Sequence, residues 1–172
     1  MLFIYPTETC YGLGCGFFNE NDVRRIYELK RRSEDKPLIV LVNSIKMWKS
    51  IAKVDKAALK LAKKFWPGPL TIIQPKRKVV PDIVSSGSIA VRWSSHPVPN
   101  KIIEALNEPI VSTSANLSGK KNPYSVKEVP KSIRNGVDEI FDWGKLPRTK
   151  PSTVVSVADG KIRVVRSGPI EI

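Results

Sequence analysis

Five consecutive apolar residues, Leu38–Val42, limit the folds open to this chain. They follow Pro37 and a basic segment, and an apolar run without polar interruption is typical of a strand buried on both faces. Further strands are expected at positions 2–5, 70–73, 89–93 and 110–112, and segments with helical spacing lie between them. This interleaving predicts one α/β (α+β) domain, residues 1–172, with a twisted mixed β-sheet and flanking helices.

Local signals place the helices and a final hairpin. Asn21 or Asp22 is expected to cap a helix that runs to the basic cluster at 30–32, and Asp55 to cap a second one that ends before the Trp-Pro-Gly-Pro sequence at 66–69. A short helix is expected at 101–106. The capping-box pattern at 125–128 predicts another, ending near Gly136. An Asp-Gly turn at 159–160 predicts a hairpin between 152 and 166.

The net charge of +13 points to an anionic partner or to a solubilising, lysine-rich surface. Nucleic acid and polyphosphate both fit the first interpretation, and charge alone does not choose between them. No apolar run approaches the roughly 20 residues that a membrane-spanning helix needs. The first residues lack the pattern of a signal peptide, so the expected location is the cytoplasm.

The cysteines and the histidine do not form a recognisable metal site. Cys10, Cys15 and His96 supply three ligands without a paired CxxC, whereas a structural zinc site requires four. The thiols are therefore predicted to be buried, small apolar groups. His96 precedes a proline in a turn, which favours a capping or surface role over catalysis.

Four segments place polar residues where packing alone does not require them. They are 6–14, 30–36, 112–119, and 152–153 together with 166–168. Glycines in the first segment fit a tight turn, and cations in the second suit a helix C-terminus. The third follows a buried strand with hydroxyls, an amide and free backbone N–H groups, which can form an anion-binding nest. Cations and hydroxyls spread in this way suit phosphate chemistry, although no Walker A sequence is present.

At these segments the chain resembles the YrdC/Sua5 family of threonylcarbamoyl-AMP synthases. The matching blocks are PTETCYGLG (6–14), KRRSEDKPLIVLV (30–42), FWPGPLTII (65–73), SIAVRW (88–93), STSANLSG (112–119), PSTVVSV (151–157) and RSG (166–168). They follow the family order over almost the whole chain. The resemblance implies a YrdC-like fold with a basic concave face, in the single-domain form without the C-terminal extension of longer Sua5 proteins.

The resemblance also implies a nucleotidyltransferase, an L-threonylcarbamoyladenylate synthase. Such an enzyme converts ATP, L-threonine and bicarbonate or CO2 into threonylcarbamoyl-AMP and pyrophosphate, for the tRNA modification N6-threonylcarbamoyladenosine (t6A). Mg²⁺ is expected to accompany ATP, held mainly by phosphates. The implied partners are RNA or tRNA and the transferase that passes the threonylcarbamoyl group to tRNA.

The family motifs assign roles to residues of this sequence. The KxR and SxN motifs fall on the expected catalytic residues Lys30, Arg32, Ser114 and Asn116. L-Threonine is expected to contact Thr9, Tyr11, Arg92, Ser112 and Ser152. ATP is expected to contact Arg32, Lys36, Ser88, Ser114, Asn122 and Arg166.

Two other functions remain open at the level of sequence. A non-catalytic protein that binds double-stranded RNA or tRNA through a basic concave surface would also explain the charge. A carbamoyl-adenylate former, similar to the YrdC domain of hydrogenase-maturation proteins, would use related chemistry. Pyrophosphate release with and without L-threonine separates the three.

Overall fold

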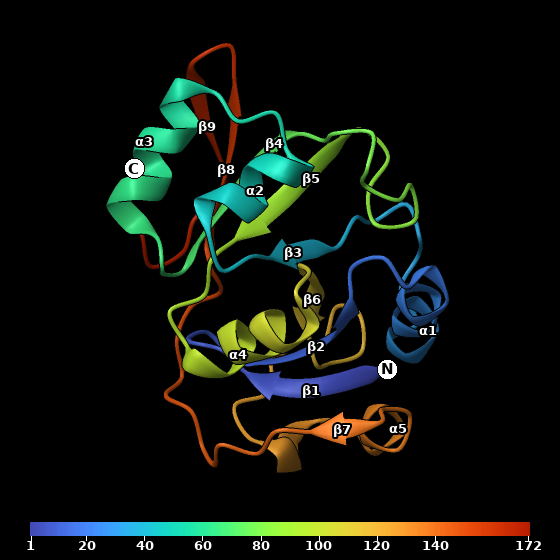
Figure 1. The fold of residues 1–172 in the computed structure, drawn as a ribbon. Helices are drawn as coiled ribbons and strands as arrows, with labels where there is room; N and C mark the ends of the chain where they lie inside the picture. The colour runs from blue at the N-terminus through green and yellow to red at the C-terminus, as the bar shows by residue number, and fades with distance from the viewer.

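A computed structural model describes all 172 residues and contains one mixed sheet of nine strands (Figure 1). The strand order is β7-β1-β2-β6-β3-β5-β4-β8-β9. The strands are β1 (Leu2–Pro6), β2 (Tyr11–Gly16), β3 (Ile39–Leu41), β4 (Leu70–Pro75), β5 (Ser88–Arg92), β6 (Ile110–Ser114), β7 (Glu139–Ile140), β8 (Thr153–Ala158) and β9 (Lys161–Arg166). Strands β1–β2 and β8–β9 run in clearly different directions, which makes the sheet strongly twisted. The predicted α/β class is confirmed.

Five α-helices and one 3₁₀ turn connect the strands. They are α1 (Glu20–Lys30), α2 (Ile45–Ile51), α3 (Lys56–Phe65), α4 (Pro97–Leu106), η1 (Val126–Glu128) and α5 (Lys131–Arg134). No helix combines the length and the apolar character that a membrane crossing requires.

Several local predictions are confirmed by side-chain geometry. Asp55 caps α3 by accepting a hydrogen bond from the backbone N–H of Ala58, at 2.7 Å. His96 caps α4, since its Nδ1 accepts from the N–H of Val98 at 3.2 Å. Asp159 and Gly160 both have positive φ, 50° and 74°, which is the backbone of the expected two-residue hairpin turn.

Other local predictions are corrected. The cap of α1 is Asn19, not Asn21 or Asp22, because its Oδ1 accepts from the N–H of Asp22 and the helix begins earlier. The helix expected after Ser125 is broken into η1 and α5. Pro130 lies between the two pieces and cannot continue a helical hydrogen-bond ladder.

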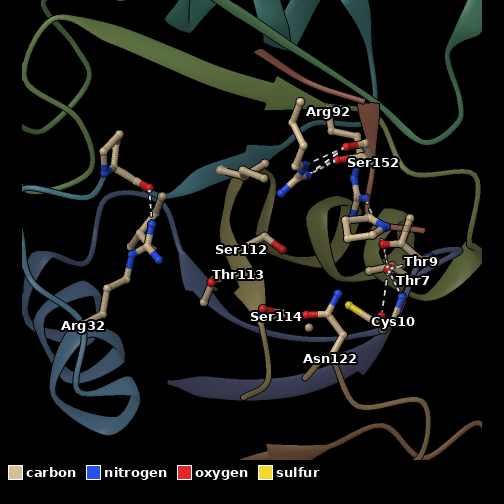
Figure 2. A pocket seen from close by; sticks show the side chains of 16 residues that line it. Thr7, Thr9, Cys10, Arg32, Arg92, Ser112, Thr113, Ser114, Asn122 and Ser152 are labelled. Atoms are coloured by element: carbon tan, nitrogen blue, oxygen red, sulfur yellow. Dashed lines mark hydrogen bonds between the residues drawn. The ribbon is translucent and has the colours of Figure 1, made fainter. Parts of the chain in front are cut away.

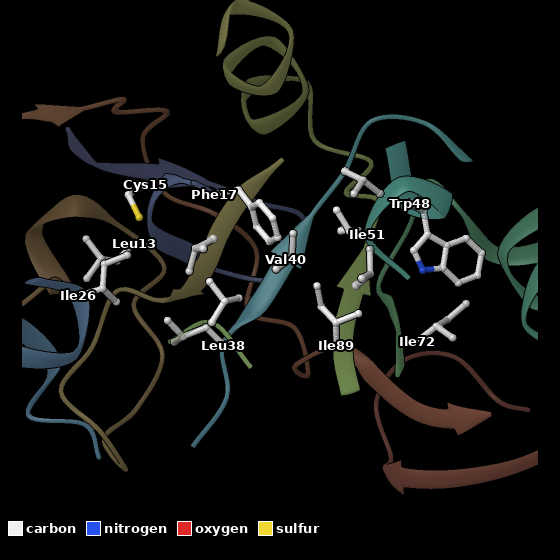
Figure 3. Close-up of a cluster of buried hydrophobic side chains, with 14 of the residues drawn as sticks. Leu13, Cys15, Phe17, Ile26, Leu38, Val40, Trp48, Ile51, Ile72 and Ile89 are labelled. Atoms are coloured by element: carbon white, nitrogen blue, oxygen red, sulfur yellow. The ribbon is translucent and has the colours of Figure 1, made fainter. Parts of the chain in front are cut away.

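The helices cover the two faces of the sheet unequally. Helices α1, α2 and α3 pack on one face over the larger apolar cluster, which includes Leu13, Val40, Trp48 and Ile72 (Figure 3). Helix α4 packs on the opposite face through Ile102 and Ile103, in a smaller cluster with Tyr5, Leu41 and Ile110. The alternation of each strand therefore decides which of its side chains reach the more open α4 face.

Replacing Leu13 with alanine should lower the free energy of unfolding by about 2–5 kcal/mol, because its side chain is fully buried and the change leaves a cavity. Leu106→Ala is the matched control, since Leu106 is 38% exposed at the end of α4. Urea denaturation followed by circular dichroism measures both. Equal destabilisation by the two variants would contradict this description of the core.

Candidate active site

A polar cavity of about 220 Å³ opens on the side of the sheet that carries α4. Its walls come from segments far apart in the sequence: the β1–β2 turn, the loop after α1 and the start of β3, the ends of β5, β6 and β9, and the residues before β8. Only three of the sixteen lining residues are hydrophobic. The lining residues are Thr7, Thr9, Cys10, Gly12, Arg32, Pro37, Leu38, Ile39, Arg92, Ser112, Thr113, Ser114, Asn122, Pro151, Ser152 and Arg166 (Figure 2).

Tyr5 supports the floor of this cavity. Its hydroxyl donates to Ser112 Oγ at 2.5 Å, and its ring lies against Gly12 and Gly14 of β2. A Cβ at Gly14 would lie 2.5 Å from the carbonyl oxygen of Val111, so only glycine allows β2 to approach this closely. The glycines of the 6–14 block thus lie in a strand, and residues 7–10 make the turn. The alternative interpretation, in which these glycines serve only to form a tight turn, does not hold.

Lys30 fixes the end of β6 from behind the cavity. The residue is 1% exposed, and its Nζ donates to the carbonyl oxygens of Ser114 and Asn116 and to Asn116 Oδ1, the last at 3.1 Å. Ser114 Oγ donates to the same Oδ1 at 2.7 Å. The Asn116 amide nitrogen in turn donates to the carbonyl oxygens of Lys120 and Lys121. These contacts position the Ser114 hydroxyl at the cavity wall.

Burial lowers the pKa of the Lys30 ammonium from 10.5 to about 8, and the nearby charge of Arg32 acts in the same direction. The ammonium form is nevertheless the one that can satisfy three oxygen acceptors, because it carries three N–H donors.

Three guanidinium groups face the cavity, from Arg32, Arg92 and Arg166, and no carboxylate lines it. Arg32 lies on one side of the opening and Arg92 on the other (Figure 2). Arg32 is oriented by the carbonyl oxygens of Lys36 and Pro37, both at 3.0 Å. Burial lowers the pKa of Arg166, and the positive charge of Arg92 lowers it further. The cavity is therefore suited to anions.

Glu8 holds Arg92 from outside the cavity lining. One Glu8 oxygen, Oε1, lies 3.6 Å from Arg92 Nη1, and the other accepts a hydrogen bond from Ser94 Oγ. Arg92 Nη1 also donates to Thr9 Oγ1 at 3.1 Å. The Nε of Arg92 is buried without a hydrogen-bond partner, so this guanidinium retains a free donor.

The C-terminal wall depends on a close backbone contact. Arg166 donates to the carbonyl oxygen of Ser152 from both Nε and Nη2, and from Nη2 to Ser152 Oγ at 3.0 Å. A Cβ at Gly168 would lie 2.4 Å from the carbonyl oxygen of Pro151 and from the N–H nitrogen of Thr153. The RSG block (166–168) therefore packs directly against the start of the PSTVVSV block (151–157), and this contact orients the Ser152 hydroxyl.

Most residues assigned from the sequence meet at this cavity. Eight of them line it: Thr9, Arg32, Arg92, Ser112, Ser114, Asn122, Ser152 and Arg166. Lys30 and Asn116 lie directly behind Ser114, as described above.

Three assigned residues lie outside the cavity lining. The Tyr11 hydroxyl donates to the carbonyl oxygen of Gly144 at 2.8 Å and accepts from the N–H of Trp143, so this side chain anchors the 142–144 segment. The exposed Ser88 begins β5, about 13 Å along the strand from Arg92. Lys36 is exposed, and its carbonyl oxygen accepts hydrogen bonds from Arg32 Nε and from the Tyr27 hydroxyl.

Sequence reasoning left some cavity residues without a role. The hydroxyl of Thr7 bonds to Thr9 Oγ1 at 3.0 Å and organises the turn between β1 and β2. Cys10 is buried, as predicted, but it lines the cavity instead of the core, while Cys15 lies in the core. The hydroxyl-rich composition of residues 6–14 was the sequence signal that could have identified Thr7. The paired contact of Glu8 with Ser94 and Arg92 has no sequence signal, since 84 positions separate Glu8 from Arg92.

A family model matches nearly the whole sequence. The model named Sua5/YciO/YrdC, described as telomere recombination, matches residues 1–168. The chain belongs to this family. The resemblance seen in the sequence is thereby confirmed.

Known members of the Sua5/YciO/YrdC family are similar over nearly the whole chain. A threonylcarbamoyl-AMP synthase of Pyrococcus abyssi is 38% identical over 174 residues, which cover 99% of this chain and 51% of that protein. The crystal structure of P. abyssi Sua5 complexed with L-threonine superposes with a TM-score of 0.92 at 39% identity, covering 97% of this chain and 50% of that one. Escherichia coli YciO gives a TM-score of 0.87 at 30% identity, covering 99% and 84%. The chain thus spans about half the length of the Pyrococcus relative.

Lys30→Met should remove a pH dependence of stability. Between pH 8 and 10.5 the unfolded chain keeps the Lys30 proton while the folded chain releases it. The free energy of unfolding of the wild type should therefore gain up to about 1.4 kcal/mol per pH unit from this group as pH rises. Below pH 8 both states hold the proton, and this contribution no longer changes.

Urea titrations of both proteins from about pH 7 to pH 11 measure this difference. Subtracting the two profiles cancels the opposite contribution of the buried thiols, whose pKa values are raised by burial. Parallel profiles throughout would show that Lys30 is not desolvated in the folded protein.

Proposed function

We propose that this protein is an L-threonylcarbamoyladenylate synthase that acts on ATP, L-threonine and bicarbonate. The observation that carries the proposal is the convergence of Arg32, Arg92 and Arg166 on one cavity that has hydroxyls and no carboxylate in its walls. The triphosphate, the threonine carboxylate and the carbamate are all anionic, and in a partly desolvated site their repulsion costs several kcal/mol unless cations compensate it. The names of the similar proteins support the same activity.

The threonine subsite would lie beside Arg92. Its free Nε donor and planar guanidinium suit the two oxygens of a carboxylate. Thr9 already contacts the same guanidinium, and Ser112 and Ser152 present hydroxyls nearby. These hydroxyls would distinguish the threonine side chain and orient its carbamate.

The ATP subsite would use the other cations of the cavity. Arg32 and Arg166 would neutralise the triphosphate, and Ser114 and Asn122 would supply neutral hydrogen bonds. Mg²⁺ would arrive bound to the phosphates, because the walls offer no carboxylate to hold it. Contacts of ATP with Lys36 and Ser88 remain predictions.

The reaction needs positioning more than covalent participation by the protein. The threonine amine attacks CO2, formed from bicarbonate, and loses a proton to give a carbamate. A carbamate oxygen then attacks the α-phosphorus of ATP, and the bond to pyrophosphate breaks. Lys30 and Asn116 would act by holding Ser114, while Arg32 would contact the charge that develops on phosphorus.

Pyrophosphate release from ATP and bicarbonate, with and without L-threonine, tests the proposal. Release that depends on threonine supports it. Release driven by carbamoyl phosphate instead would favour the hydrogenase-maturation type of chemistry. Absence of release from a folded protein that binds RNA tightly would refute the synthase.

Arg92→Lys should raise the KM for threonine about 10- to 100-fold with a smaller change in kcat. A lysine keeps the charge but loses one of two parallel hydrogen bonds, a loss of about 1.5–3 kcal/mol. Lys127→Gln, which changes an exposed residue outside the cavity lining, is the control and should behave as wild type. An unchanged KM in Arg92→Lys would place the threonine carboxylate elsewhere.

Glu8→Gln should weaken threonine binding less than Arg92→Lys does. Glutamine keeps the acceptor for Ser94 but removes the charge that faces Arg92, so we expect a KM increase of about 5-fold. Initial rates at varied threonine measure it. A loss confined to kcat would show that Glu8 acts on the chemical step and not through Arg92.

The proposal has four further parts. The protein would bind RNA, and a separate transferase would pass its product to tRNA. It would act in the cytoplasm and fold as a single domain over residues 1–172. RNA affinity is supported by the net charge of +13. As the sole function it is the second candidate, and it would need neither the Ser152 hydroxyl nor the Asn116 network.

A further inference from the structure

Most of the net positive charge of this chain comes from one segment, residues 45–78, that does not line the cavity. Residues 45–78, which contain α2 and α3, hold ten Lys and Arg residues and a single carboxylate, Asp55. This segment alone supplies +9 of the net +13. A surface that serves only solubility usually mixes both signs of charge.

The charges form one exposed surface. The lysines of α3 recur at spacings of four and three residues, so they share the side of the helix opposite the buried Ala58 and Leu61. Lys46 and Lys49 of α2 are three residues apart on that helix, and both are exposed while Trp48 and Ile51 are buried. We name this set the α2–α3 lysine surface: Lys46, Lys49, Lys53, Lys56, Lys60 and Lys63.

The two helices are neighbours on the same face of the sheet (Figure 1). The rings of Trp48 in α2 and Trp66 at the end of α3 are 4.7 Å apart in edge contact. None of the six lysines forms an ion pair, and Asp55 is occupied as the cap of α3. Like charges four residues apart, as at Lys56 and Lys60, destabilise an isolated helix. An anionic partner would remove that cost.

The surface lies on the other side of the sheet from the cavity. Arg92 and Ser112 line the cavity, whereas their strand neighbours Val91 and Val111 belong to the apolar cluster beneath α1, α2 and α3. Since successive side chains of a strand point to opposite faces, a partner on the lysine surface would leave the cavity open.

We propose that the α2–α3 lysine surface binds the phosphate backbone of a folded RNA. Three lysines of α3 span about 10 Å along one helix, and α2 adds a second row, which suits a polyanion with regularly spaced charges. A lipid surface fits less well, because helices at membrane interfaces insert apolar side chains. No large hydrophobic residue of α2 or α3 is exposed. The proposal gives a site to the RNA affinity proposed above, and it differs from the basic concave face expected from the sequence.

Fluorescence anisotropy with an unmodified tRNA transcript, at salt concentrations from about 50 to 200 mM, tests the proposal. The variant Lys56→Glu/Lys60→Glu/Lys63→Glu should weaken binding at least about 10-fold and reduce the slope of log K against log salt by about 2–3. The control variant Lys101→Glu/Lys127→Glu/Lys131→Glu has the same net charge but changes exposed lysines elsewhere. The affinity of this control variant for tRNA should stay within about 2-fold of that of the wild type.

An equal loss of tRNA affinity in the two variants would overturn the proposal, because it would show that binding depends on the overall charge and not on this surface. Tighter binding to anionic phosphatidylserine vesicles than to tRNA at the same salt would overturn it in favour of a membrane, and no binding of tRNA by the wild type would also refute it. Threonine-dependent pyrophosphate release should be unchanged in both variants. A wild type that binds tRNA through this surface but releases no pyrophosphate would refute the synthase alone.

Discussion

The buried ammonium of Lys30 is the interaction on which the cavity depends. Taking a cation out of water is costly unless every donor finds an acceptor, and here all three acceptors come from Ser114 and Asn116. The contact joins the end of α1 to the end of β6, two elements that are distant in the sequence. It also orients Ser114, while Asn116 continues the network toward the loop that carries Asn122. One buried charge thus sets the position of a whole wall.

The sheet separates two positively charged regions with different physical characters. In the cavity, a few guanidinium groups are partly desolvated and oriented by hydrogen bonds, which suits small anions in fixed positions. On the α2–α3 lysine surface, the charges are exposed, flexible and unpaired, which suits a large anion bound through many weak contacts. The net charge of the whole sequence does not distinguish these two regions.

Sequence patterns were sufficient where a local rule decides the structure. Asp55 as a cap and Asp159–Gly160 as a turn follow from the chemistry of single residues, and the motif blocks anticipated eight of the cavity-lining side chains. Sequence patterns failed where tertiary contacts decide the local structure. Helix α2 was missed because its short apolar stripe is stabilised by packing of Trp48. Tyr11 was misplaced because a motif does not fix the face to which a strand residue points.

The contact of Gly168 with the backbone around Ser152 has a consequence for local unfolding. Ser152 and Arg166 line the cavity from the hairpin of β8 and β9, and β9 is the edge strand of the sheet. A hairpin at a sheet edge can open at a lower free energy than the whole fold. Such an opening would withdraw both side chains from the cavity while the remaining strands stay paired, so the cavity can be lost before the protein as a whole unfolds.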